Sequence, residues 1–230
     1  MVSLCALTLA AFGHGAAAFG APASASVKPG TYRVVLQSPG GDLPFGLDLA
    51  REGAGWVGYL VNGRERLKVS EVSVKGSHLD VKMPGYENRL TADAKGDELQ
   101  GEIVLDKLGG KDQHIPLRAQ FERRYRFFPQ PSGGNADVSG RWSVTFADDD
   151  GKTETAVAEF SQSRGVVTGT FLTDTGDHRF LAGQVRGDEL YLSTFDGAHA
   201  FLYRAKIVGA DGSARVGLPL PGALAGDFWS

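Results

Sequence analysis

Two segments of the chain repeat one pattern at a nearly constant spacing. GTYRVVL at residues 30–36 and GRWSVTF at residues 140–146 each begin with a glycine, followed by apolar side chains at every second position. The two glycines are 110 residues apart, and four later pairs are 111 residues apart: Gly58 and Gly169, Gly76 and Gly187, Leu79 and Leu190, and Leu90 and Phe201. A match sustained over this length predicts a tandem duplication.

Within each copy, short segments such as Leu43–Leu49 alternate apolar and polar residues, which is the pattern of a half-buried β-strand. Turn-forming pairs such as Asn62-Gly63 and Asp211-Gly212 separate these segments. No stretch beyond the N-terminal region shows helical periodicity, and about seven or eight strands per copy leave no room for crossover helices. The sequence therefore predicts an all-β protein of two tandem antiparallel meanders, each a barrel or a sandwich.

We expect the first β domain over residues 26–128 and the second over residues 140–230. Residues 129–139 between them are rich in Pro, Ser and Gly, a composition typical of a linker. The short basic run of Arg123, Arg124 and Arg126 is interpreted as a solvated strand end rather than a phosphate site.

Residues 1–25 are typical of a secretory signal peptide. Residues 4–12 are apolar but too short to span a bilayer, and small residues follow up to the cleavage pattern Ala23-Ser24-Ala25. Neither Lys nor Arg precedes the apolar run, which is atypical of such signals. We expect export to the periplasm or cell envelope, with a mature chain that starts near Ser26 and has no transmembrane segment.

Cys5 is the only cysteine and lies in the predicted signal peptide. The mature chain would then form neither a disulfide nor a Cys-x-x-Cys redox pair, and we expect it to need no cofactor. The net charge of −3 disfavours a nucleic-acid partner, because nucleic-acid binding usually needs a basic surface.

Polar residues that could carry chemistry gather in the second copy. Asp174, Asp177 and His178 lie at one predicted turn, and His199 could meet them across strands as a metal site. No two histidines have the short spacing of a zinc motif, so strand-end histidines bonded to turn carboxylates or water are the alternative. The Asp-Thr-Gly triplet at 174–176 matches aspartic proteases, but the first copy has Asn62-Gly63 at the corresponding position, which favours a hairpin turn. We assign no catalytic residue.

Aromatic side chains form a second candidate site. They lie at strand spacing and could line the mouth of a ligand-binding barrel, or they could be ordinary core. The residues are Trp56, Tyr59, Trp142, Tyr191, Phe201 and Tyr203.

Parts of both copies resemble a known family. TGDHRFLAG at 175–183, LYLSTFDGAHAFLY at 190–203 and GDFWS at 226–230 resemble the N-terminal region of bacterial TlpA-family thiol-disulfide oxidoreductases. LPFGLDL at 43–49 and LVNGRERL at 60–67 are similar to it too. The resemblance implies an exported, two-part β region that precedes a thioredoxin-like domain with a Cys-x-x-Cys pair. None of the family's redox residues corresponds to a residue of this chain.

The resulting hypothesis is a non-catalytic β module, present as a fragment or a stand-alone form. It would serve positioning, docking or dimerisation beside a thioredoxin-like domain or redox partner protein. The alternatives are an envelope barrel that binds a small ligand or peptide, and a hydrolase that uses Asp174, Asp177 and His178.

Overall fold

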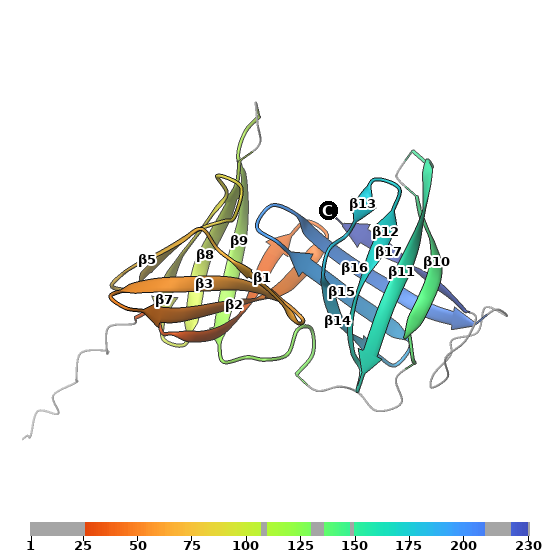
Figure 1. Ribbon diagram of the computed structural model, residues 1–230, viewed down its shortest axis with the longest axis horizontal. Coiled ribbons are helices and arrows are strands. Elements are labelled where there is room, and N and C mark those ends of the chain that lie inside the picture. Colours follow the sequence, from red (N-terminus) through yellow and green to blue (C-terminus); the bar gives the residue numbers. More distant parts are fainter. Residues whose placement is uncertain (1–25, 107–109, 130–135, 148–149, 210–221, 230) are drawn as a thin grey trace, which may run out of the picture.

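A computed structural model describes residues 26–106, 110–129, 136–147, 150–209 and 222–229 of the chain (Figure 1). Every helix or strand among them is a β-strand, and the strands form two curled antiparallel sheets, which we call the first unit and the second unit. This confirms the predicted all-β class with two antiparallel units. The predicted signal peptide, with Cys5, and most of the predicted linker lie outside the described residues.

The first unit is a nine-stranded sheet in the order β4-β3-β2-β1-β9-β8-β7-β6-β5. Its strands are β1 (Gly30–Ser38), β2 (Gly41–Glu52), β3 (Gly55–Asn62), β4 (Glu65–Lys68), β5 (Glu71–Lys75), β6 (His78–Lys82), β7 (Arg89–Lys95), β8 (Glu98–Leu105) and β9 (Gln113–Phe121). The chain passes from β4 to β5 through Val69 and Ser70, whose N–H groups donate to the carbonyls of Gly58 and Lys82 at 3.0 Å each. The two ends of the curled sheet are thereby joined.

The interior of the first unit is filled by its own side chains. Because successive side chains of a strand point to opposite faces, the apolar positions of the alternating pattern all point inward. Leu36, Phe45, Leu79 and Ile103, from four different strands, and Met83, which directly follows β6, are almost completely buried. Burial of apolar surface, at roughly 25 cal/mol per Å² removed from water, is the main force that holds the sheet curled.

The second unit is an open sheet in the order β10-β11-β12-β14-β15-β16-β17, with the short β13 paired to β12. Its strands are β10 (Gly140–Ala147), β11 (Thr153–Ser163), β12 (Val166–Thr173), β13 (Gly176–Asp177), β14 (Leu181–Arg186), β15 (Glu189–Phe195), β16 (Ala200–Gly209) and β17 (Gly222–Trp229). Trp142, Phe160, Phe171, Leu192 and Tyr203 are among its core residues.

The two units have the same strand succession. Gly30 and Gly140 open β1 and β10, while Gly76 and Gly187 form the tight turns before β6 and β15 with φ of +63° and +65°. The short β13 pairs with β12 as β4 pairs with β3. Strands β10–β17 therefore follow β1–β8 in order, which agrees with the predicted duplication.

One strand of the first unit has no counterpart in the described part of the second. β9 pairs with both β1 and β8. The corresponding strands of the second unit, β10 and β17, each pair with a single described strand and stand at the two edges of the sheet. Among the described residues, β10 and β17 are therefore edge strands, whereas β1 and β8 of the first unit are paired on both sides.

Candidate functional site: the cavity between the two units

The two units share a core. β15 and β16 lie against β2 of the first unit (Figure 1). Phe195 and Leu202 of the second unit belong to the buried cluster of the first, and the ring of Phe195 lies 4.8 Å from that of Phe45. Because apolar side chains of both units are buried together, separating the units would expose them to water.

Two buried asparagines join the backbones of the units across this core. Asn62, at the end of β3, donates from Nδ2 to the carbonyl of Phe195 at 2.9 Å and accepts at Oδ1 from its N–H at 3.3 Å. Asn88 donates to the carbonyl of Gly197 at 2.8 Å and accepts from the N–H of Asp106 at 2.8 Å. Each amide satisfies polar backbone groups that would otherwise be costly to bury.

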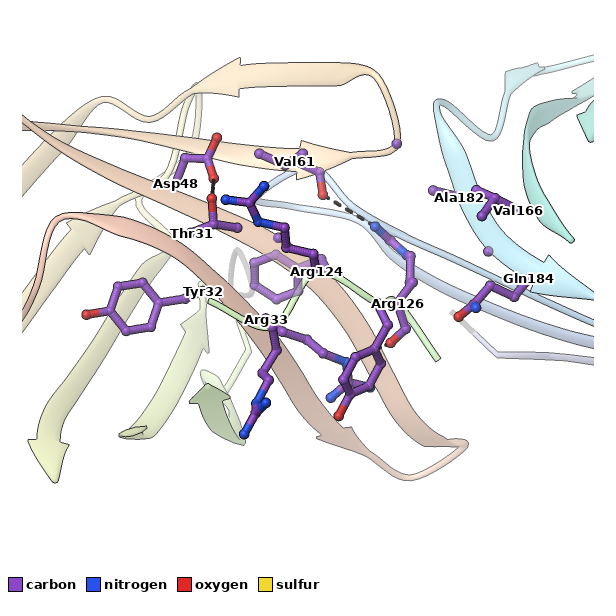
Figure 2. A pocket seen from close by; sticks show the side chains of 16 residues that line it. Thr31, Tyr32, Arg33, Asp48, Val61, Arg124, Arg126, Val166, Ala182 and Gln184 are labelled. Carbon is purple, nitrogen blue, oxygen red and sulfur yellow. Dashed lines mark hydrogen bonds between the residues drawn. The ribbon is translucent and has the colours of Figure 1, made fainter. Parts of the chain in front are cut away.

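Arg126, between the two sheets, is the centre of the polar contacts. Its Nε donates to Ser193 Oγ at 2.9 Å, and its Nη2 donates to Ser193 O at 2.8 Å and to Asn62 Oδ1 at 2.9 Å. Its Nη1 donates to the carbonyl of Val61 at 3.3 Å, as Figure 2 shows. Ser193 Oγ in turn donates to the carbonyl of Pro44 at 2.7 Å. One guanidinium therefore binds the first unit and the second at the same time.

The positive charge of Arg126 is held by dipoles. Among the described residues it forms no ion pair, and its partners are carbonyl, amide and hydroxyl oxygens. Burial, and after it the positive charge of Arg33, lower the pKa of Arg126 to about 9. Arg126 stays protonated at neutral pH, so the interface contains a cation without a carboxylate partner. The interpretation of Arg126 as part of a solvated strand end is wrong, although Arg123 and Arg124 are exposed.

Glutamine side chains fix the ends of the connection between the units. Gln184 Oε1 accepts from the N–H groups of Phe127 and Phe128, both at 2.8 Å, and its Nε2 donates to Phe128 O at 3.1 Å. Gln162 accepts from the N–H of Val138 and donates to the carbonyl of Ala136, both at 2.9 Å. The described residues on either side of 130–135 are therefore bonded to the second unit.

A cavity of about 500 Å³ opens where the units and their connection meet (Figure 2). Its lining includes Arg33 and Asp48 of the first unit, Arg124 and Arg126 of the connection, and Ala182 and Gln184 of the second unit. Neither unit could form this cavity alone.

The charge of the lining is positive. Four arginines line the cavity, with Asp48 as the carboxylate. Asp48 is bonded to Thr31 Oγ1 at 2.8 Å and lies 3.0 Å from Nη2 of Arg66. Arg124 pairs with Glu122 at 3.2 Å, an exposed pair that water screens. The cavity can therefore attract an anion.

None of the six aromatic residues predicted to bind a ligand is among the described residues that line this cavity. Trp56 and Tyr59 lie under the guanidinium groups of Arg51 and Arg66, at 3.9 and 4.3 Å from the ring centroids. Tyr191 packs against Phe128, with ring centroids 5.0 Å apart. Trp56, Tyr59 and Tyr191 therefore pack against neighbouring side chains of the protein. Ligand binding by these three residues stays a prediction.

The other three are in the second unit. Trp142 is buried and donates from Nε1 to the carbonyl of Val138 at 2.8 Å. Phe201 and Tyr203 lie on β16 beside His178, one of the residues of the predicted metal site.

The described residues contain no group of three or more His, Cys, Asp and Glu side chains that could hold a metal ion. Asp174 and Asp177 are exposed on the β12–β13 hairpin, and Asp177 accepts from the N–H of Arg179 at 3.0 Å. His199 lies 3.1 Å from Asp196 Oδ2. Asp174 and Asp177 therefore face solvent, and a hydrolase that uses them stays a prediction.

His178 is part of an aromatic stack in the second unit. Its ring lies 5.0 Å from Phe201 at 26° and 5.5 Å from Phe146 at 28°, and its Nδ1 is hydrogen-bonded to the hydroxyl of Tyr203. Burial lowers the pKa of His178, while nearby acidic groups partly oppose that shift. The stack therefore favours the neutral imidazole.

No family model, curated protein or solved structure matches this chain. The resemblance to the TlpA family accordingly stays a prediction based on the sequence segments quoted above. Among the described residues, no helix has the length and apolar character needed to cross a membrane.

Replacing Arg126 by Met tests its role at the interface. The change removes one donor from each of the oxygens of Asn62, Val61 and Ser193 that Arg126 bonds, and we expect the free energy of unfolding to fall by about 1–3 kcal/mol. Urea denaturation followed by tryptophan fluorescence measures this. Arg89→Met is the control, since Arg89 forms an exposed pair with Asp80 and its loss should change stability by less than about 0.5 kcal/mol. An unchanged or higher stability of Arg126→Met would show that desolvation of the charge outweighs its bonds.

The shifted pKa of His178 predicts a pH-dependent stability. Because the folded chain binds this proton less tightly than the unfolded chain, its contribution is retained above the ordinary pKa of 6.5 and lost as the pH falls below it. We expect His178→Gln to lose less stability than the unaltered chain between pH 7 and pH 5, measured by thermal unfolding. His114→Gln, a change at an exposed residue beside Glu102, should keep the original pH dependence. Parallel pH profiles of His178→Gln and the unaltered chain would contradict the prediction.

Proposed function

We propose that this chain is an exported, non-catalytic β module of a TlpA-like thiol-disulfide oxidoreductase. In this role it positions or docks a thioredoxin-like partner in the periplasm or cell envelope. The observation that carries the proposal is that β10 and β17 are edge strands of the described second unit, whereas β9 pairs with the corresponding strands of the first unit.

A strand at this position has a defined task in the first unit. β9 pairs with β1 over Tyr32–Leu36 and with β8 over Glu98–Leu105. It also buries Ile115, Leu117 and Ala119 in the core. Sheet edges bind extended segments through main-chain hydrogen bonds, and alternate side chains then give specificity. An extended segment of the partner with apolar residues at every second position fits the same position in the second unit.

The interface between the units supports a positioning role. The shared core at Phe195 and the contacts of Arg126 and Asn62 make one body of the two sheets. A partner docked on the second unit would thus be held at a fixed place relative to the first.

The cavity between the units favours a second function, binding of a small ligand. This cavity is a different site from the predicted barrel mouth, because it lies between the two sheets. The interior of the first unit is filled by its own side chains.

Export is tested by cell fractionation and N-terminal sequencing of the protein expressed with residues 1–25. We expect it outside the cytoplasm with a new N-terminus near Ser26. Replacing Ala25 by Lys should block cleavage, since the site needs small residues. An unprocessed cytoplasmic protein would refute export.

Docking is tested by hydrogen exchange of this chain in the presence of a thioredoxin-like protein. The protein to use is one whose coding sequence lies in the same reading frame as this chain or in a neighbouring gene. We expect its addition to slow backbone amide exchange in β10 and β17, because an added strand would bond to these edges. β9, which already has two neighbours, serves as the internal control. Protection that needs only a higher concentration of this chain would assign the edge to a second copy. No change in β10 or β17 would rule out this mode of docking.

A further inference from the structure

We propose that the cavity between the units binds a small organic anion, with Arg33 and Arg126 recognising a carboxylate or phosphate group. The inference goes beyond the proposed docking function, because it needs no thioredoxin-like partner. It rests on the position, contacts and charge of the arginines in the lining.

Arg33 offers hydrogen-bond donors to such a ligand. It is part-buried on β1, and its guanidinium lies over the ring of Tyr125 with 4.7 Å between Cζ and the centroid. Its Nε donates to the carbonyl of Arg126 at 2.8 Å. Among the described residues it forms no ion pair, and Asp42 is 3.4 Å from Arg118. The planar fork of a guanidinium held in this way suits the two oxygens of a carboxylate or phosphate.

Arg126 would act on the ligand mainly through its positive charge, because most of its hydrogen-bond donors are already used. Four of its bonds reach protein oxygens, which fixes the guanidinium in place. None of these partners is a carboxylate, so its positive charge stays uncompensated at the cavity wall. A fixed charge in a partly desolvated site acts on a ligand more strongly than one in open water.

The two arginines also act on each other. Burial, followed by the positive charge of Arg33, lowers the pKa of Arg126. Burial also lowers the pKa of Arg33. A bound anion would relieve both effects, since an opposite charge stabilises the protonated form of each group.

The size and walls of the cavity fit a small molecule. Its volume of about 500 Å³ lies within the range of roughly 300–1,000 Å³ typical of ligand sites. The lining adds Tyr125 and Phe45 from one side and the apolar Val166 and Ala182 from the other. An anion attached to a compact organic body would use both the charge and these walls.

The test measures binding of citrate and of inorganic pyrophosphate to residues 26–230 by isothermal titration calorimetry in 20 mM NaCl. We expect one of them to bind at a single site, more weakly in 300 mM NaCl because salt screens the charges. The tighter of the two identifies carboxylate or phosphate as the preferred group. The uncharged triethyl ester of citrate is the ligand control and should not bind.

Variants then locate the site. Arg33→Gln should weaken binding by about tenfold or more, the loss typical of one charged hydrogen-bonding partner, and Arg33→Lys should weaken it less. Arg89→Gln is the matched control because it removes the same charge from an exposed site outside the cavity lining. Val166→Trp should block binding by filling the cavity, which tests the site without altering an arginine. Circular dichroism checks that each variant is folded.

Three results would overturn the inference. The first is that neither anion binds. The second is that Arg33→Gln and Arg89→Gln lose equal affinity for the anion. The third is that both Arg33→Gln and Val166→Trp bind the anion with unchanged affinity. None of these results bears on docking at β10 and β17, so the two proposals can fail separately.

Discussion

The guanidinium of Arg126 is the contact on which the arrangement of the two units depends. It binds Val61 and Asn62 on one side and Ser193 on the other, without a carboxylate to neutralise it. A lysine could not reach these acceptors together, because only a guanidinium presents several donors in a fixed plane. The surrounding core at Phe195 excludes water and so strengthens these bonds. Polar contacts and apolar burial therefore fix the same geometry.

The bonding of Arg126 by uncharged oxygens leaves a positive charge at the interface between the units. Oxygens from dipoles can satisfy the N–H groups of Arg126, but they supply no net negative charge. Arg33, which donates to the backbone of Arg126, brings a second cation to the same cavity. The feature that holds the units together thus also makes the cavity between them attractive to anions, and the two properties share one cause.

The repeat spacing made much of the fold predictable from the sequence. Alternation and turn glycines such as Gly76 and Gly187 are local signals, and the strands follow them. The cavity was not predictable in this way, because its lining comes from segments far apart in the chain. Asn62 was predicted to be part of a turn, whereas it is the last residue of β3, and its bonds to Phe195 depend on how the units pack. The basic run of Arg123, Arg124 and Arg126 shows the limit most clearly, since nothing local distinguishes the part-buried Arg126 from the exposed Arg123 and Arg124.

The two units differ in their described sheets although they follow the same strand succession. In the first unit, β9 pairs with both β1 and β8, so neither of these strands is an edge. In the described chain only the first unit has that strand, so its core is enclosed by its own residues. The second unit contributes Phe195 and Leu202 to that same core and presents β10 and β17 as edges. The filled first unit thereby holds the described second unit in place through a shared core, while β10 and β17 remain the edges of its described sheet.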